Sequence, residues 1–138
     1  MKIKLIAVGK LRKRYVKEGV ADYVSRIKHY VPFEIIEVKE GKTEQYLSKD
    51  AFNAILDMRG KTFSSEEFAE FIRDKMIKGK SLAFFIGGAE GFDDSIRKKA
   101  DILISFSKMT FPHELARLML TEQIYRALTI IKGEKYHK

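Results

Sequence analysis

The sequence contains no cysteine. This absence excludes a disulfide framework, a cysteine nucleophile, a zinc knuckle and an iron–sulfur cluster, because each of these needs thiol or thiolate side chains. A chain without disulfides suits the reducing cytoplasm, which is the compartment that we expect. We expect no bound metal.

Long apolar runs are also missing. The N-terminal segment MKIKLIAVGK has too short an apolar part for a signal peptide, and nothing approaches the ~18 apolar residues of a membrane span. We therefore expect no membrane partner. The chain has 138 residues, of which 45% are hydrophobic, and this is enough for one ordinary core. We predict a single domain over residues 1–138.

Positive charge is plentiful and unevenly placed. The formal net charge is +8, and the first thirty residues hold nine Lys and Arg but only two acidic residues, Glu18 and Asp22. Four of these cations stand in one short run, Lys10, Arg12, Lys13 and Arg14. Such a concentration predicts an anionic partner, although an ordinary solvated surface is the simpler alternative.

Apolar periodicity predicts five strands and four helices in the order β-α-β-β-α-β-α-β-α. The run Leu82 to Ile86 is continuously apolar, which is typical of a parallel strand covered on both faces. The expected fold class is therefore α/β, a three-layer α/β/α domain with a mostly parallel sheet. The expected strands end at Val8, Val38, Asp57, Ile86 and Phe106, and the expected helices lie within residues 16–31, 64–79, 94–100 and 112–131.

Two local signals support these boundaries. Ser64 and Glu67 form a capping-box pattern, and Phe63 and Phe68 stand where a hydrophobic staple needs them. Pro112 suits the first turn of the last helix, because its missing N–H would have no partner there. Residues 39–50 are polar and are expected to form a loop with a turn of helix.

Three unusual segments follow three of the predicted strands: LDMRG, IGGAEGF and SFSKMTF. The carboxyl ends of parallel strands share one edge of a sheet, where open α/β sheets bind ligands. The glycines of IGGAEGF permit close backbone approach, but their spacing fits neither a dinucleotide fingerprint nor a P-loop. Taken alone, this glycine segment is more often a tight strand-to-helix turn.

These segments also carry a resemblance. The segment SFSKMTFPHELARLMLTEQIYRA, the upstream IGGAEG and LDMRGK, and the terminal GEKYHK together resemble the RlmH family, the pseudouridine N3-methyltransferases of bacterial large-subunit ribosomal RNA within the SPOUT superfamily. The likeness extends over nearly the whole chain. It implies a trefoil knot in the C-terminal half, whereas ordinary topology rules favour an unknotted sheet. Residues 39–50 are shorter than the family pattern usually is.

The resemblance implies S-adenosylmethionine as the cofactor. The family's cofactor positions correspond to Leu56, Gly87, Phe106, Ser107, Lys108, Met109, Thr110 and Phe111. For Met109 and Phe111, an ordinary place in the core is the alternative. We expect His113, in the first turn of the last helix, to serve for capping or packing rather than catalysis.

The C-terminal tail is the second candidate site. A chain end normally frays, so Tyr136 and His137 need a reason to be there. With the resemblance, we expect Tyr136 to stack on a base and His137 to act as a general base or to orient the nucleobase. Lys138 and Arg126 are expected to contact RNA, and for Arg126 an ion pair with Glu122 is an equal alternative.

The resemblance implies methylation of N3 of a pseudouridine in the bacterial 23S ribosomal RNA of the large subunit, on the assembled ribosome. Lys10, Arg12, Lys13 and Arg14 would then contact RNA. The apolar stripe of the last helix is too wide for one packed face, so we expect a homodimer. The alternative is a non-catalytic protein that binds the ribosome and keeps the fold without using the cofactor.

Overall fold

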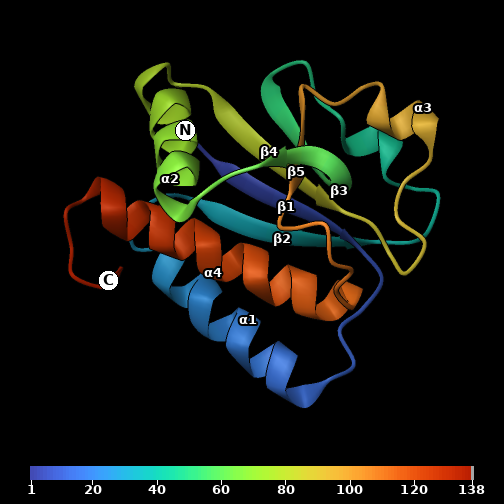
Figure 1. The fold of residues 1–138 in the computed structure, drawn as a ribbon, viewed down its shortest axis with the longest axis horizontal. Helices are drawn as coiled ribbons and strands as arrows, with labels where there is room; N and C mark the ends of the chain where they lie inside the picture. The colour runs from blue at the N-terminus through green and yellow to red at the C-terminus, as the bar shows by residue number, and fades with distance from the viewer. Residues whose placement is uncertain (138) are drawn as a thin grey trace.

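The computed structural model describes residues 1–137. Its centre is a five-stranded sheet in the order β2-β1-β4-β3-β5, in which all four neighbouring pairs are parallel (Figure 1). The strands are β1 (Ile3–Val8), β2 (Phe33–Val38), β3 (Ala51–Thr62), β4 (Ser81–Ile86) and β5 (Ile102–Ser105). The α/β class and the parallel sheet that the sequence predicted are confirmed.

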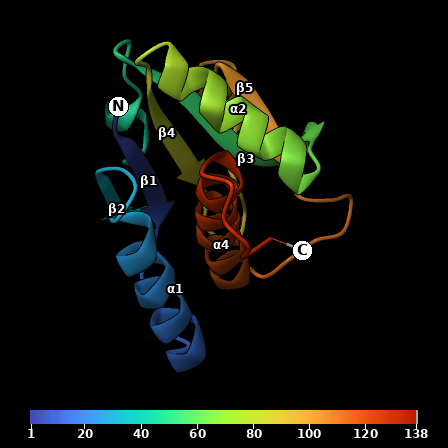
Figure 2. The same cartoon turned by 90° about the vertical axis from the view of Figure 1, so that its left-hand side faces the viewer.

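Three helices cover one face of the sheet: α1 (Arg14–Ile27), α2 (Ser65–Ile77) and α4 (His113–Ile131) (Figure 2). Side chains from all three meet Ile3, Leu5 and Phe84 in the larger core cluster. The opposite face is covered more thinly, by the short α3 (Asp94–Arg97) and by the 3₁₀ helix η1 (Glu44–Tyr46). The sheet is therefore the middle of three layers, with most of the helical mass on one side.

The local signals around α2 are confirmed. The Glu67 N–H donates to Ser64 Oγ at 3.0 Å, and the Ser64 N–H donates to Glu67 Oε1 at 2.8 Å. The Phe63 and Phe68 rings meet edge to face with centroids 6.3 Å apart. The last helix begins one residue later than Pro112 suggested, because Pro112 has an extended ψ of 138° and serves as its N-cap.

The predicted end of β3 is wrong. The strand does not stop at Asp57 but continues to Thr62, since Leu56 and Lys61 both pair with Ile104 of β5. Residues 57–60 therefore form a bulge that leaves the ladder and returns to it. Gly60 makes the return possible, because a Cβ at this position would lie 2.5 Å from the backbone nitrogen of Ile104.

The wide stripe of α4 is partly explained within the chain. This helix lies between α1 and α2 as well as over the sheet (Figure 2), and Leu118 packs against the open side of Gly19 in α1. The C-terminal trefoil knot implied by the resemblance stays a prediction. No helix among residues 1–137 is both long and apolar enough to span a membrane.

Candidate functional site

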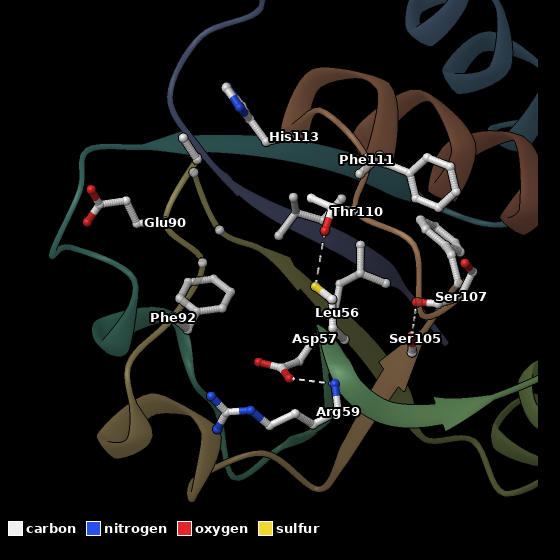
Figure 3. A pocket seen from close by; sticks show the side chains of 18 of the residues that line it. Leu56, Asp57, Arg59, Glu90, Phe92, Ser105, Ser107, Thr110, Phe111 and His113 are labelled. Atoms are coloured by element: carbon white, nitrogen blue, oxygen red, sulfur yellow. Dashed lines mark hydrogen bonds between the residues drawn. The ribbon is translucent and has the colours of Figure 1, made fainter.

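Three loops at the carboxyl edge of the sheet enclose one cavity of about 580 Å³ (Figure 3). They are the β3 bulge, the glycine loop after β4 and the loop between β5 and α4. The cavity has the size of an ordinary small-molecule site. It is lined by Leu56 to Arg59, by Ile86 to Phe92 and Arg97, and by Ser105 to Phe111 with His113 and Ala116.

The structure thus brings together all eight predicted cofactor positions, from Leu56 and Gly87 to the segment 106–111. They come from three different loops, which the chain order alone does not place side by side. Their roles as cofactor ligands stay a prediction. The alternative that Met109 is a core residue is wrong, because its side chain is 73% exposed at the rim of the cavity.

The β3 bulge is held from the side by Arg97. Its guanidinium donates to Asp57 Oδ2 at 3.4 Å, and it also bonds the carbonyl of Phe92 and the carboxylate of Asp94. This hydrogen bond from Arg97 is the main cause that lowers the pKa of Asp94. One cation therefore ties the bulge, the end of the glycine loop and α3 together. Nothing in the sequence pattern singled out Arg97.

The glycine loop folds tightly on itself. A Cβ on Gly87 would come within 2.9 Å of the Gly91 backbone, and the Gly91 N–H donates to the carbonyl of Gly88 at 3.0 Å. Gly91 itself has a φ of +69°, which favours glycine. The bare backbone of this loop consequently forms one wall of the cavity.

Internal hydrogen bonds shape the loop after β5. Ser105 Oγ donates to the carbonyl of Ser107 at 2.9 Å, and the Met109 N–H donates to Ser107 Oγ at 2.8 Å. Thr110 Oγ1 lies 3.7 Å from the sulfur of Met58, so this loop touches the bulge across the cavity mouth (Figure 3). Apolar side chains from both loops, among them Leu56 and Phe111, form the walls.

His113 lines the cavity from the first turn of α4, where Figure 3 shows it beside the segment that leaves β1. The sequence suggested a capping or packing role and did not place it at the cavity. Glu114 and Arg117, one and four residues further on, do not line the cavity. Glu114 contacts the backbone of the basic run and Arg117 contacts Gly9 just before it, which the sequence did not predict.

The predicted catalytic residues of the tail, Tyr136 and His137, lie away from the cavity. Tyr136 packs edge to face on Tyr125 with centroids 4.7 Å apart, and its hydroxyl donates to Glu122 Oε2 at 2.9 Å. Burial, followed by its hydrogen bonds with Tyr23 and Glu122, raises the pKa of Tyr136. Neither Tyr136 nor His137 lines the cavity. Lys138 lies outside the described residues.

Arg126 joins the tail to α4. Its Nη2 lies 2.6 Å from Glu122 Oε2, as the ion-pair alternative expected, and its Nη1 lies 2.9 Å from His137 Nδ1. On its other side, His137 Nε2 lies 3.3 Å from Glu66 Oε1 at the start of α2. The tail is therefore folded back and fastened to two helices. The RNA role of Arg126 stays a prediction.

The basic run lies at the opposite end of α4 from this fastening. Lys10, Arg12 and Lys13 are exposed in the loop between β1 and α1, and Arg14 opens α1 with an ion pair to Glu18 at 3.1 Å. Within residues 1–137, no three His, Asp or Glu side chains come close enough together to hold a metal ion.

Comparisons with known proteins identify the family of this chain. The model of a family described as predicted SPOUT methyltransferase matches residues 1–137. A relative from Coprothermobacter proteolyticus, named ribosomal RNA large subunit methyltransferase H, is 52% identical over 139 residues and 100% of each chain. A protein of the same name from Streptococcus pyogenes is 43% identical over 159 residues, again with 100% of each chain covered.

Two solved structures share the fold at low sequence identity. A probable methylase family protein from Haemophilus influenzae has a TM-score of 0.60 at 12% identity, over 99% of this chain and 70% of that chain. A putative methyltransferase from Legionella pneumophila, in complex with bound SAM, has a TM-score of 0.58 at 14% identity, over 92% and 66%. With matches that run from end to end, this chain belongs to the SPOUT methyltransferases, in the family of ribosomal RNA large subunit methyltransferase H.

Proposed function

We propose that this protein transfers a methyl group from S-adenosylmethionine to N3 of a pseudouridine in the 23S ribosomal RNA of the large subunit, acting on the assembled ribosome in the cytoplasm. One observation carries the proposal. Loops from three strand ends converge on a single cavity in a chain that is 52% identical to a named ribosomal RNA methyltransferase.

The residues around the cavity fit such a cofactor. Gly87 lines the cavity and packs closely against the Gly91 backbone, and the backbone groups of this glycine loop would bind an adenine edge. Leu56, Phe106 and Phe111 offer apolar surface for its ring. Asp57 and Glu90 are the acidic residues that line the cavity, and the Asp57 carboxylate already accepts hydrogen bonds from Arg59 and Arg97. When bound, S-adenosylmethionine supplies an electrophilic methyl group.

The protein's own task is to align the acceptor and to remove its proton. N3 of pseudouridine carries a proton that must leave before or during attack, and a positioned base accelerates such a step by roughly 10² to 10⁴. We assign this task to His137, which accepts the proton or orients the base, and we assign stacking on the nucleobase to Tyr136.

A homodimer would explain how a tail that lies away from its own cavity takes part in catalysis. The tail of one chain is fastened to α2 and α4 of that chain, away from its own cavity. We propose that it serves the cofactor of a second copy. The half-buried apolar residues Leu115, Leu118 and Met119 near the start of α4 supply surface for such an interface. A monomer in sedimentation at micromolar protein would contradict this arrangement.

The basic run supplies the outer RNA contact in this proposal. Lys10, Arg12, Lys13 and Arg14 stand exposed next to the first turn of α4, whose His113 lines the cavity. Lys138 and Arg126 are assigned to RNA at the tail. The Glu122 carboxylate that holds Arg126 would then compete with a phosphate for the same guanidinium.

The test is transfer of labelled methyl groups to ribosomal RNA, both as naked RNA and within assembled ribosomes. We expect label on pseudouridine N3, with assembled ribosomes preferred. Isothermal titration with S-adenosylmethionine is the companion measurement. Ribosome binding without uptake of the methyl donor would establish the non-catalytic alternative, which family membership does not favour.

A His137→Ala variant tests the proposed base. We expect it to bind RNA and cofactor normally but to lose most of the methylation rate. A full rate in this variant would overturn the assignment of His137 and leave the rest of the proposal standing.

A further inference from the structure

The loop between β1 and α1 lacks a local anchor. It carries Lys10, Arg12 and Lys13, and Lys13 is the N-cap of α1 but makes no side-chain hydrogen bond to the helix. Ser, Thr, Asp or Asn normally stabilise a helix start of this kind. Four cations close together also repel one another, so some other part of the molecule must fix the loop.

Glu114 supplies that anchor from about a hundred residues away. Its Oε1 accepts the N–H of Arg12 at 2.8 Å and the N–H of Lys13 at 3.0 Å. These are charge-assisted bonds to two successive backbone groups, which define the position of the loop more tightly than contacts to long side chains. They are also the main causes that lower the pKa of Glu114.

Arg117, one turn further along α4, holds the other end of the same loop. Its side chain is only 2% exposed, and its Nη2 donates to the Gly9 carbonyl at 2.9 Å. Its Nη1 donates to Glu37 Oε2 of β2 at 2.6 Å. The basic loop is thus held at its start by Arg117 and near its end by Glu114.

The same turn of α4 also forms part of the cavity wall. His113 and Ala116 line the cavity, while Glu114 and Arg117 grip the basic loop. Four residues within the stretch 113–117 of one helix therefore contact either the cavity or the loop. Because a helix turn is rigid, the distance between the loop and the cavity is fixed.

We propose that Glu114 is a positioning residue for the RNA substrate. It holds the backbone of Arg12 and Lys13 so that a phosphate bound there places the acceptor base at the methyl donor. This inference rests on the proposed function. This role differs from a purely electrostatic one. The negative charge of Glu114 by itself weakens the attraction of the basic run for RNA, whereas its hydrogen bonds to the loop backbone would strengthen productive binding.

Three variants that each remove one negative charge separate these roles. Glu114→Ala removes the acceptor, whereas Glu114→Gln keeps an acceptor oxygen without the charge. Glu18→Ala is the matched control, because Glu18 pairs with the side chain of Arg14 in the same basic run. Charge alone predicts that all three variants bind RNA somewhat more tightly.

Positioning predicts a different pattern. We expect Glu114→Ala to lower kcat/KM for the RNA substrate by about tenfold or more, with unchanged affinity for S-adenosylmethionine. Glu114→Gln should recover most of this loss, and Glu18→Ala should show none. Amide hydrogen exchange at Arg12 and Lys13 should accelerate in Glu114→Ala and remain slow in Glu18→Ala.

The failures are distinguishable. If the wild type transfers no methyl group to ribosomal RNA, the proposed function fails and this inference fails with it. If the wild type is active but Glu114→Ala matches Glu18→Ala in kcat/KM and in amide exchange, only this inference is overturned. If Glu114→Ala folds poorly, Glu114→Gln supplies the test. Wild-type amide exchange at Arg12 and Lys13 together with a tenfold lower kcat/KM in Glu114→Gln would also contradict the positioning role.

Discussion

At the scale of single residues, the cavity depends on positions where a side chain is missing. Gly60 lies against the backbone of β5, where a Cβ would come within 2.6 Å of three atoms of Leu103 and Ile104. Backbone atoms cannot move aside independently. The bulge that places Asp57 and Met58 at the cavity therefore requires glycine at its return to the sheet.

Replacement of Gly60 by alanine tests this requirement. We expect Gly60→Ala to lower the free energy of unfolding by about 1–3 kcal/mol, the usual cost of forcing extra volume into a packed site. Denaturant titration measures the loss. Gly19→Ala is the control, since its Cβ would meet only the flexible end of Leu118, and alanine is the better helix former by about 1 kcal/mol. Equal losses of unfolding free energy in both variants would contradict the proposed clash between the new Cβ and the backbone of β5.

A second residue-scale prediction concerns Tyr30. Burial, followed by its hydrogen bond to Glu134, raises the pKa of Tyr30 to about 12. In the unfolded chain it ionises near 10, so its contribution to stability is complete below pH 10 and is lost as the pH rises toward 12. We expect Tyr30→Phe to lose one late-ionising group in an ultraviolet titration and to lose less stability than the wild type when the pH rises from 9 to 11. An unchanged titration would contradict the prediction.

The sequence predicted the residues of the cavity better than those that support it. Leu56, Gly87 and the segment 106–111 carry recognisable motifs, and all line the cavity. Arg97 and Glu114 act through contacts with segments far away in the chain, with Asp57 and Arg12 respectively. Local patterns contain no information about such contacts, and so neither role was predicted.

At the scale of elements, the start of α2 is the boundary that the sequence pattern predicts best. Both hydrogen bonds of the capping box are present, and the staple residues Phe63 and Phe68 touch. We expect Ser64→Ala to destabilise the fold by about 1 kcal/mol, because one backbone N–H at the helix start loses its partner. Ser25→Ala, on the exposed side of α1, should cost less. Thermal or denaturant unfolding of the two variants decides between them.

The other half of this box depends on pH. The Ser64 N–H is the main cause that lowers the pKa of Glu67 below its usual 4.5. This contribution is therefore present above pH 4.5 and disappears as the pH falls through the lowered value. We expect Glu67→Gln to be less stable than the wild type at pH 7, with a smaller difference at pH 3. A difference independent of pH would argue against an ionised partner.

Local sequence patterns predicted the strands but not every strand end. Periodicity located all five strands, since each is a short apolar run bounded by glycine, proline or polar residues. It misplaced the end of β3, because Arg59 and Gly60 look like a turn and only the pairing of Lys61 with Ile104 shows that the strand resumes. A bulge is defined by its neighbour, and the neighbouring strand lies about forty residues further along the chain.

At the scale of the whole molecule, the uneven charge predicts how RNA binding responds to salt. Each phosphate neutralised on unpaired RNA contributes about −0.7 to the slope of log affinity against log salt. We expect Arg12→Ala to reduce the magnitude of this slope by about 0.7. Lys28→Ala is the control, because it removes the same charge at the far end of α1. Identical slopes in both variants would remove the basic run from the RNA contact.

The order of the strands has a consequence for how this chain is made. β1 pairs with β2 on one side and with β4 on the other, so Ile3 can meet Phe33 early but meets Leu82 only after some eighty residues have been synthesised. The helix that closes the sheet, α4, is the last element of all. A sheet joined through such distant pairs forms slowly. The middle of this protein therefore cannot assemble while the first half of the chain is being translated. The apolar side chains of β1 lack the neighbours that β4 and α4 supply until translation is nearly complete.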